Sequence, residues 1–207
     1  MARPTGSRDK QFETRRVALI AAARQHLGAP GGRNASWRDL AAACGVSVST
    51  LAHYFGTRTA LVAAILEQSG KDGAIYLEMA ARPSGPFAQS IADLVRSIGQ
   101  GFDYGVLTLQ VIGLSEGFAH PDAAAAYLGH HLEPILGAIR TRLQAHIDRG
   151  DMRQTDARFA AISLLSPMVI ARLHQSALGG ATGFPMSLPD FDAAHTGAFT
   201  RAFAADA

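Results

Sequence analysis

The stretch SWRDLAAACGVSVSTLAHYFGTRTAL, residues 36–61, decides the fold. Ser36 and Asp39 have the spacing of a capping box, in which the hydroxyl accepts a backbone N–H and the carboxylate favours the positive end of a helix. Gly45 predicts a sharp left-handed turn after a short helix, and Ser47 predicts the N-cap of a second helix. The stretch therefore predicts two short helices joined by a tight turn, which is a helix-turn-helix.

The apolar residues of the stretch predict the same arrangement. The first helix has one apolar face, because four apolar residues follow the helical spacing i, i+3, i+4 and i+7: Trp37, Leu40, Ala41 and Cys44. The second helix keeps Leu51 and Phe55 for the core and presents small residues at its front. Such a helix lies in the major groove of DNA with its N-terminal residues at the base edges. The front residues that we expect there are Ser47, Val48, Ser49 and Thr50.

A longer pattern surrounds the motif, and its residues are Leu19, Ala22, Ala23, Leu27, Gly31, Ser36–Ala41, Gly45–Ser47, Leu51, Tyr54–Phe55, Thr57–Arg58 and Leu61. Together these residues resemble the N-terminal domain of the tetracycline-repressor (TetR) family, over Arg15–Gln68. The resemblance implies an all-α fold. It consists of an N-terminal three-helix helix-turn-helix domain and a C-terminal helical domain for ligand binding and dimerisation.

The resemblance also implies which side chains meet DNA. In the family pattern the side chain at Tyr54 contacts a phosphate, and Arg58 matches a position, usually lysine, that lies against the DNA backbone. A helix N-terminus at Arg58 favours an anion as well. The alternative is that Tyr54 and Arg58 are ordinary surface residues. The full predicted set of DNA-binding residues is Ser36, Arg38, Ser47, Val48, Ser49, Thr50, His53, Tyr54 and Arg58.

The charge distribution agrees with a front end that binds a polyanion. Residues 1–60 contain nine Lys or Arg and three Asp or Glu, a net charge of +6, whereas residues 61–207 contain ten and fourteen, a net charge of −4. A basic domain next to an acidic one is typical of a nucleic-acid-binding domain joined to a domain of another kind. Chance imbalance on solvated faces is the alternative.

The sequence predicts that the chain consists of three segments. Residues 1–12 are predicted to be a flexible basic arm, residues 13–68 the helix-turn-helix DNA-binding domain, and residues 69–207 a helical effector-binding and dimerisation domain. The arm either places an arginine in the minor groove or is a disordered terminus. The single cysteine, Cys44, cannot form an internal disulfide, and no signal peptide or membrane span is apparent, so we expect a cytoplasmic protein.

The second domain is expected to hold a small-molecule effector in a cavity between helices. The predicted effector-binding residues are Phe102, Tyr104, Phe118, His120, Tyr127, His131, Met168 and His174. Aromatic and methionine side chains at helical spacing are more often plain core, which is the competing interpretation. By resemblance, the last two helices form the dimer interface as a four-helix bundle across subunits. Its predicted residues are Phe159, Ile162, Val169, Leu173, Phe191, Phe199 and Phe203.

Two patterns suggest catalysis or metal binding, and neither has the context it needs. Gly113–Gly117 spells the G-x-S-x-G of a hydrolase nucleophile elbow, but that motif requires a strand before the turn, and no strand is predicted. Four histidines lack the spacing of a metal site: His120, His130, His131 and His174. We therefore expect no catalytic residue, no metal, no cofactor and no enzyme.

The resemblance implies a ligand-responsive transcriptional regulator. In this interpretation a homodimer binds a palindromic DNA operator as a repressor and is released by a small-molecule effector. Two alternatives remain open. One is an activator or a sequence-indifferent DNA-binding protein of the same fold, and the other is a helical enzyme that uses Ser115 or His131.

Overall fold

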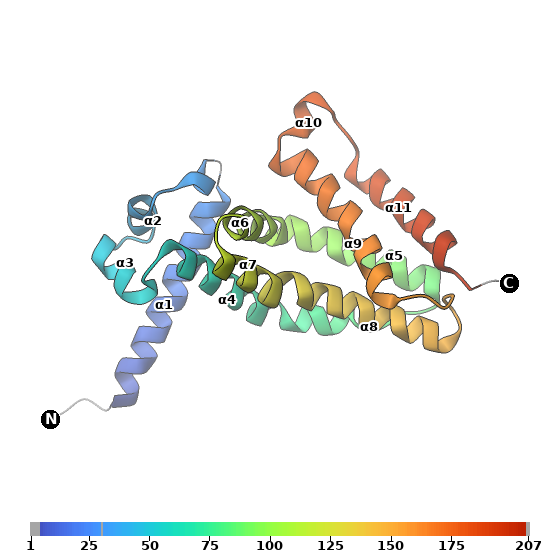
Figure 1. Ribbon diagram of the computed structural model, residues 1–207, viewed down its shortest axis with the longest axis horizontal. Coiled ribbons are helices and arrows are strands. Elements are labelled where there is room, and N and C mark those ends of the chain that lie inside the picture. The colour runs from blue at the N-terminus through green and yellow to red at the C-terminus, as the bar shows by residue number, and fades with distance from the viewer. Residues whose placement is uncertain (1–4, 30, 206–207) are drawn as a thin grey trace. The chain divides into compact units, whose positions relative to one another are not determined.

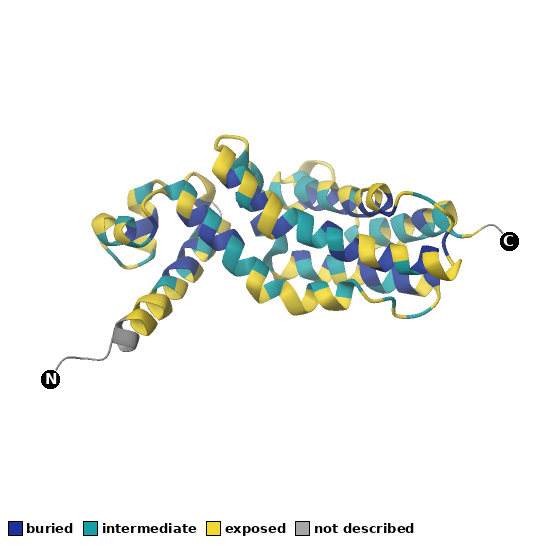
Figure 2. Cartoon of the chain, turned by 60° about the horizontal axis from the view of Figure 1, so that its bottom comes forward, coloured by how far each residue is buried: buried dark blue, intermediate teal, exposed yellow. Residues whose placement is uncertain are grey.

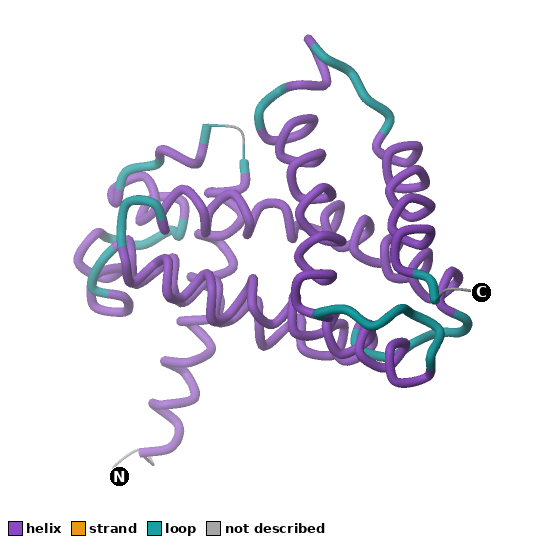
Figure 3. The backbone as a smooth tube through the Cα atoms, turned by 45° about the vertical axis from the view of Figure 1, so that its right-hand side comes forward, coloured by secondary structure: helices purple, strands orange, loops and turns teal. Residues whose placement is uncertain are grey.

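The structure is a computed structural model that describes residues 5–29 and 31–205. Within these ranges helices joined by loops make up the chain (Figure 3), with one isolated antiparallel bridge between Met152 and Ala204. The predicted all-α fold is confirmed. Among the described residues no helix combines the length and the apolar character needed to cross a membrane.

The chain divides into two compact units. The first comprises the residues up to Asp72 together with Ile112–His131, and the second comprises Gly73–Val111 together with the residues from Leu132 onward. The chain thus passes between the units more than once, so each unit is built from segments that are distant in sequence.

The first unit contains the helix-turn-helix (Figure 1). Its elements are α1 (Thr5–Gly28), the 3₁₀ turn η1 (Gly32–Asn34), α2 (Trp37–Ala43), α3 (Val48–Phe55), the first part of α4 (Arg58–Ala80), the end of α6 (Leu107–Gly117), α7 (Pro121–Tyr127) and most of η3 (Leu128–Leu132). Helix α2 packs on both α1 and α3. Leucines from four helices are fully or almost fully buried in this unit, namely Leu19, Leu40, Leu51 and Leu61.

Helix α1 begins earlier than the sequence indicates. We predicted a flexible arm over residues 1–12 and the DNA-binding domain from residue 13, whereas the structure has a helix from Thr5; residues 1–4 lie outside the described residues. The residues of α1 from Asp9 to Arg15 are exposed (Figure 2). An apolar anchor accompanies the extra turns, because the ring of Phe12 stacks on the ring of Tyr54 in α3.

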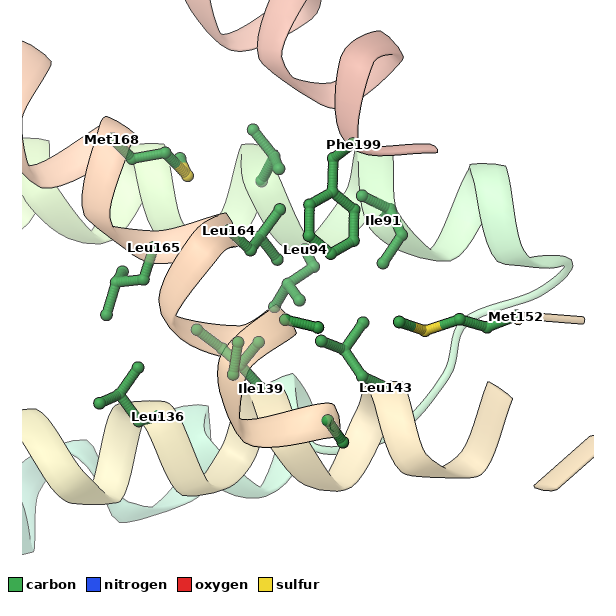
Figure 4. Close-up of a cluster of buried hydrophobic side chains, with 14 of the residues drawn as sticks. Ile91, Leu94, Leu136, Ile139, Leu143, Met152, Leu164, Leu165, Met168 and Phe199 are labelled. Carbon is green, nitrogen blue, oxygen red and sulfur yellow. The ribbon is translucent and has the colours of Figure 1, made fainter. Parts of the chain in front are cut away.

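The second unit is built around one apolar core. Its elements are the last part of α4, α5 (Phe87–Gly101), the π-helical turn η2 (Phe102–Val106), the start of α6, α8 (Glu133–Arg149), α9 (Ala157–Arg172), the π-helical turn η4 (Leu173–Ala177), α10 (Gly180–Gly183) and α11 (Leu188–Phe203). Helix α9 packs on α8 and α11, and α11 also packs on α5. Side chains from these four helices meet in the core (Figure 4), among them Ile91, Leu143, Leu164 and Phe199.

A buried arginine in the second unit links α8 to α4 and α5. The Arg142 guanidinium of α8 donates to the carbonyl oxygens of Met79 (3.0 Å) and Ala80 (2.7 Å) at the end of α4, and to the carbonyl oxygen of Ser90 (2.9 Å) in α5. The last carbonyls of a helix have no partner within the helix, so this side chain caps α4. Burial lowers the pKa of Arg142.

Candidate nucleic-acid interface

The N-terminus of α2 carries the predicted capping box. The backbone N–H of Asp39 donates to Oγ of Ser36 (3.2 Å), and the backbone N–H of Ser36 donates to Oδ2 of Asp39 (2.8 Å). The Ser36 hydroxyl also donates to this carboxylate oxygen (2.7 Å). The hydrogen bonds from the Ser36 side chain and backbone lower the pKa of Asp39. Ser36 and its neighbour Arg38 are exposed, as a contact with DNA requires.

The turn between α2 and α3 has the predicted geometry. Gly45 has φ 65°, in the left-handed region that favours glycine. The N–H of Val46 donates to the carbonyl oxygen of Ala41 (3.0 Å), which closes the turn. Ser47 caps α3, because its Oγ accepts the backbone N–H of Thr50 (3.1 Å). The predicted helix-turn-helix is therefore confirmed.

Helix α3 has a buried side and an exposed side. Leu51 and Phe55 are buried, whereas Val48 is 41% exposed and Ser49 is exposed. The front hydroxyls already form hydrogen bonds with one another, at 2.9 Å between Ser47 and Ser49 and 2.8 Å between Ser47 and Thr50. A hydroxyl has one donor and two acceptor positions, so each retains capacity for a base or phosphate. The methyl groups of Val48 and Thr50 suit contact with a thymine methyl.

Three aromatic side chains cluster beside the second half of α3. The rings of Phe12 and Tyr54 are stacked with centroids 4.5 Å apart, and His53 meets both rings edge-on, at 6.2 Å from Phe12 and 5.7 Å from Tyr54. His53 is exposed and Tyr54 is half-buried. The cluster joins α1 to two predicted DNA-binding residues. Our sequence analysis missed Phe12 because it assigned this residue to a flexible arm.

Arg58, a predicted contact of the DNA backbone, forms hydrogen bonds within the protein. Its Nε donates to Oε1 of Glu116 (2.6 Å), Nη2 donates to the carbonyl oxygen of Arg33 (3.0 Å), and Nη1 donates to the carbonyl oxygen of Ala35. The Arg58 side chain is 25% exposed and that of Glu116 is 11% exposed. All three nitrogens of Arg58 are thus bound within the protein, and a contact of this side chain with the DNA backbone stays a prediction. Glu116 lies in α6, outside the motif, so no sequence signal indicated this ion pair.

The predicted effector-binding residues are divided between the units. Phe118, His120, Tyr127 and His131 belong to the first unit, and Phe102, Tyr104, Met168 and His174 belong to the second. Tyr104 and Phe118 are 85% and 87% exposed, whereas Phe102 and Met168 lie in the apolar core of the second unit. One surface depression of the second unit lies on α8 and contains none of the predicted residues; it is lined by Arg140, Thr141, Gln144, Ala145 and Asp148.

Tyr127 and His131 lie together inside the first unit. Their ring centroids are 5.6 Å apart, and both residues are buried. Burial raises the pKa of Tyr127 to about 12. Burial and the nearby charge of Arg24 lower the pKa of His131 to about 4, so its imidazole is neutral at pH 7. Nε2 of His131 is buried and has no hydrogen-bond partner among residues 5–29 and 31–205.

The predicted dimer residues differ in exposure and fall into three groups. Phe159 and Ile162 are 68% and 39% exposed on α9, and Ile170 on the same helix, which our sequence analysis missed, is 64% exposed. Phe199 is 4% exposed and belongs to the core, because α11 turns this ring toward the other helices of the unit. The remaining predicted residues are partly buried, namely Val169, Leu173, Phe191 and Phe203.

The G-x-S-x-G sequence lies within a helix. Residues 113–117 belong to α6, where Oγ of Ser115 donates to the carbonyl oxygen of Ile112 (3.2 Å). A nucleophile elbow instead places its serine on a strained turn between a strand and a helix. In the described part of the chain no three His, Cys, Asp or Glu side chains are grouped as a metal site requires.

Comparison with known proteins identifies the N-terminal domain. Residues 19–65 match the family model of bacterial regulatory proteins of the tetR family. Among curated proteins, none matches this sequence.

Solved structures of TetR-family regulators share the fold. One is SmeT of Stenotrophomonas maltophilia, the repressor of the multidrug efflux pump SmeDEF, with a TM-score of 0.63, 18% identity and coverage of 92% of this chain and 91% of that one. A TetR family transcriptional regulator of Pseudomonas syringae has a TM-score of 0.65, 18% identity and coverage of 91% and 96%. RolR, solved with its ligand resorcinol, has a TM-score of 0.60, 18% identity and coverage of 96% and 91%.

Proposed function

We propose that the chain, whose residues 19–65 match the family model of bacterial regulatory proteins of the tetR family, is a repressor that binds a palindromic operator as a homodimer. In this proposal a small molecule bound by the helical body releases the operator, and the chain acts in the cytoplasm without catalysis. The observation that carries the proposal is the helix-turn-helix, whose second helix has a buried apolar side and an exposed polar front.

The proposed DNA contacts are exposed or half-buried side chains of α2, α3 and their N-caps. Ser36 and Arg38 at the start of α2 reach phosphates, while Ser47, Val48, Ser49 and Thr50 at the front of α3 reach base edges. His53 and Tyr54 lie further along α3 and contact the backbone. A single recognition helix reads only one half-site, so a homodimer with two-fold symmetry requires an inverted repeat.

The exposed apolar stripe on α9 supports the homodimer. Phe159, Ile162 and Ile170 lie on one face of this helix and are at least 39% exposed. An exposed apolar patch of this kind is typical of a surface that another chain covers. We propose a four-helix bundle in which α9 and α11 pack against the same helices of a second copy. The predicted residue Phe199 has no part in it, because the core of its own chain covers it.

The ligand response rests on the fold and on two neighbours. RolR is solved with resorcinol, and SmeT is the repressor of a multidrug efflux pump. We propose by analogy a small molecule in the helical body of this chain. Such a ligand must bind one conformation, in which the spacing of the two recognition helices does not fit the operator, more tightly than the DNA-binding conformation. A ligand that binds both conformations equally well does not shift the equilibrium between them.

Selection of bound sequences from a random double-stranded DNA pool tests the proposal. We expect an enriched inverted repeat when the purified protein is used at near-physiological salt. Salt-sensitive binding without enrichment would contradict an operator-specific repressor and favour the sequence-indifferent alternative. Once the operator is known, a small molecule that abolishes operator binding is identified as the effector. Transcription from an operator-controlled promoter then distinguishes repression from activation.

The dimer is tested by Phe159→Glu. A charge in the centre of an apolar interface leaves it unpaired and desolvated, so we expect a monomer by light scattering coupled to size exclusion. Tyr76→Glu is the matched control, since Tyr76 is 70% exposed in the same unit but belongs to α4. Dimers of both variants would show that the α9 stripe is not the interface.

A further inference from the structure

Arg58 lies at the centre of a three-way contact within the first unit. It is the first residue of α4, its side chain is three-quarters buried, and it donates to acceptors on two other segments. One acceptor is the Glu116 carboxylate of α6, and the other two are the carbonyls of Arg33 and Ala35. The planar guanidinium matches several acceptors in a fixed geometry, which a lysine ammonium cannot reproduce.

The two carbonyls stand directly before the start of α2. Ala35 precedes Ser36, the N-cap of α2. The segment from Gly31 to Ala35 is a loop and a single 3₁₀ turn, and such segments are held in place chiefly by contacts with neighbouring elements. Arg58 therefore ties the entry of α2 to the start of α4, next to exposed Ser36 and Arg38.

Glu116 lies in the part of α6 that approaches α7 closely. At Gly113 an added Cβ would lie 2.1 Å from Cδ2 of Tyr127, and at Gly117 it would lie 3.2 Å from Cα of Ala124. Both glycines therefore allow α7 to approach the backbone of α6. The two glycines of the G-x-S-x-G sequence thus allow close packing of α7 on α6. Glu116 lies between these glycines in the sequence and pairs with Arg58.

We propose that Glu116 is a positioning residue of the DNA-binding surface. Its carboxylate holds Arg58 against the Arg33 and Ala35 carbonyls, and this clamp fixes the N-terminus of α2 relative to that of α4. Glu116 touches no DNA in this proposal, and it lies 51 residues beyond the end of the matched region at residue 65. The inference rests on the proposed function, because it assumes that the surface around Ser36 binds DNA.

The sign of the effect of Glu116→Gln is the decisive result. Removing a negative charge near a DNA-binding surface strengthens phosphate binding through electrostatics alone, so a bystander carboxylate predicts equal or tighter binding. A positioning role predicts the reverse. We expect roughly tenfold weaker binding to a labelled mixed-sequence DNA duplex, the usual consequence of losing a charge-assisted hydrogen bond.

Glu67→Gln is the matched control. Glu67 lies in the same unit and pairs with Lys71 at 2.7 Å on the exposed surface of α4, so this change also breaks an ion pair and frees a cation. Arg58→Lys is the second informative variant, because it keeps the charge but loses the planar fork. Weaker binding by Arg58→Lys supports the clamp, whereas unchanged binding indicates a simple point charge and contradicts it.

Trp37 reports on the clamp without DNA. It is the only tryptophan of the chain and the first residue of α2, directly after the clamped segment. We expect a changed emission spectrum and easier quenching of Trp37 in Glu116→Gln and Arg58→Lys, but not in Glu67→Gln. An unchanged Trp37 signal, or DNA binding by Glu116→Gln as tight as in the unmodified chain, would overturn the inference. Absence of DNA binding by the unmodified chain would instead overturn the proposed function.

Discussion

The ring of Phe12 stacks on the ring of Tyr54, with centroids 4.5 Å apart and an angle of 17° between the planes. The contact joins the first turns of α1 to the second half of α3. Tyr54 is half-buried as a result, and its orientation depends on a residue 42 positions earlier in the sequence.

Phe12→Ala should weaken DNA binding without changing its sequence preference. The truncated side chain no longer orients Tyr54, and the loss of a partly exposed aromatic pair costs about 0.5–1 kcal/mol of stability. Binding of several duplexes of different sequence, followed by fluorescence anisotropy, measures the effect. Val17→Ala, at a residue 43% exposed on the same helix, is the control and should bind DNA normally.

Thr50→Ala and Tyr54→Ala should have different effects on DNA binding. Thr50 lies at the front of α3, where its hydroxyl hydrogen bonds to Ser47, so its loss should alter which bases are preferred. We proposed that Tyr54 contacts the phosphates, so its loss should weaken binding to all sequences alike. Selection from a random pool with each variant distinguishes these effects. Identical profiles for the two variants would contradict the placement of α3 in the major groove.

His131 should make the protein less stable in mild acid. Its pKa is about 4 in the folded chain, against 6.5 for an exposed imidazole, so between these values the unfolded chain binds a proton that the folded chain does not. The free energy of unfolding therefore falls as the pH drops from 6.5 toward 4, by about 2 kcal/mol from this residue between pH 7 and pH 5. Urea unfolding at both pH values measures it. His131→Phe should remove this contribution, and an unchanged pH dependence would show that other groups cause it.

The ion pair between Arg172 and Asp192 should be important for the second unit. The guanidinium nitrogens lie 3.0 and 2.5 Å from the two carboxylate oxygens, and the side chains are 6% and 18% exposed. Asp192→Ala leaves a buried cation without its partner, which costs about 3–5 kcal/mol of stability. Urea unfolding checks this value. The exposed pair between Arg158 and Glu133 provides the control, because Glu133→Gln should have no measurable effect.

Gly113→Ala should destabilise the first unit by about 2 kcal/mol. The added methyl would overlap the buried ring of Tyr127, which cannot move aside without disturbing the packing of α7 on α6. Gly137→Ala is the control, since no neighbouring side chain or other element of the described chain lies within 4 Å of its new Cβ and α8 should gain about 0.5–1 kcal/mol from the loss of a helical glycine. Thermal unfolding followed by circular dichroism compares the two variants. A Gly113→Ala variant as stable as the unmodified chain would show that Tyr127 has room to shift.

The DNA-binding motif could be predicted because its signals are local. Capping by Ser36 and Ser47 and the positive φ of Gly45 each depend on residues within a few positions of one another. Apolar periodicity likewise identified Leu51 and Phe55 as the buried side of α3. The start of α1 was predicted wrongly, because its helix is accompanied by a contact between Phe12 and Tyr54 that no local pattern reveals.

The sequence alone thus determined the all-α fold, the helix-turn-helix and the resemblance to TetR-family regulators, since hydrogen bonds within a helix and its caps join near neighbours along the chain. Only the tertiary structure decided which partners distant side chains find. It paired Arg58 with Glu116 within the protein, placed Phe199 in the core and left Ile170 exposed. The physical reason is that burial and ion pairing depend on which surfaces meet when helices pack, and helical periodicity gives the face of a helix but not the neighbour that covers it.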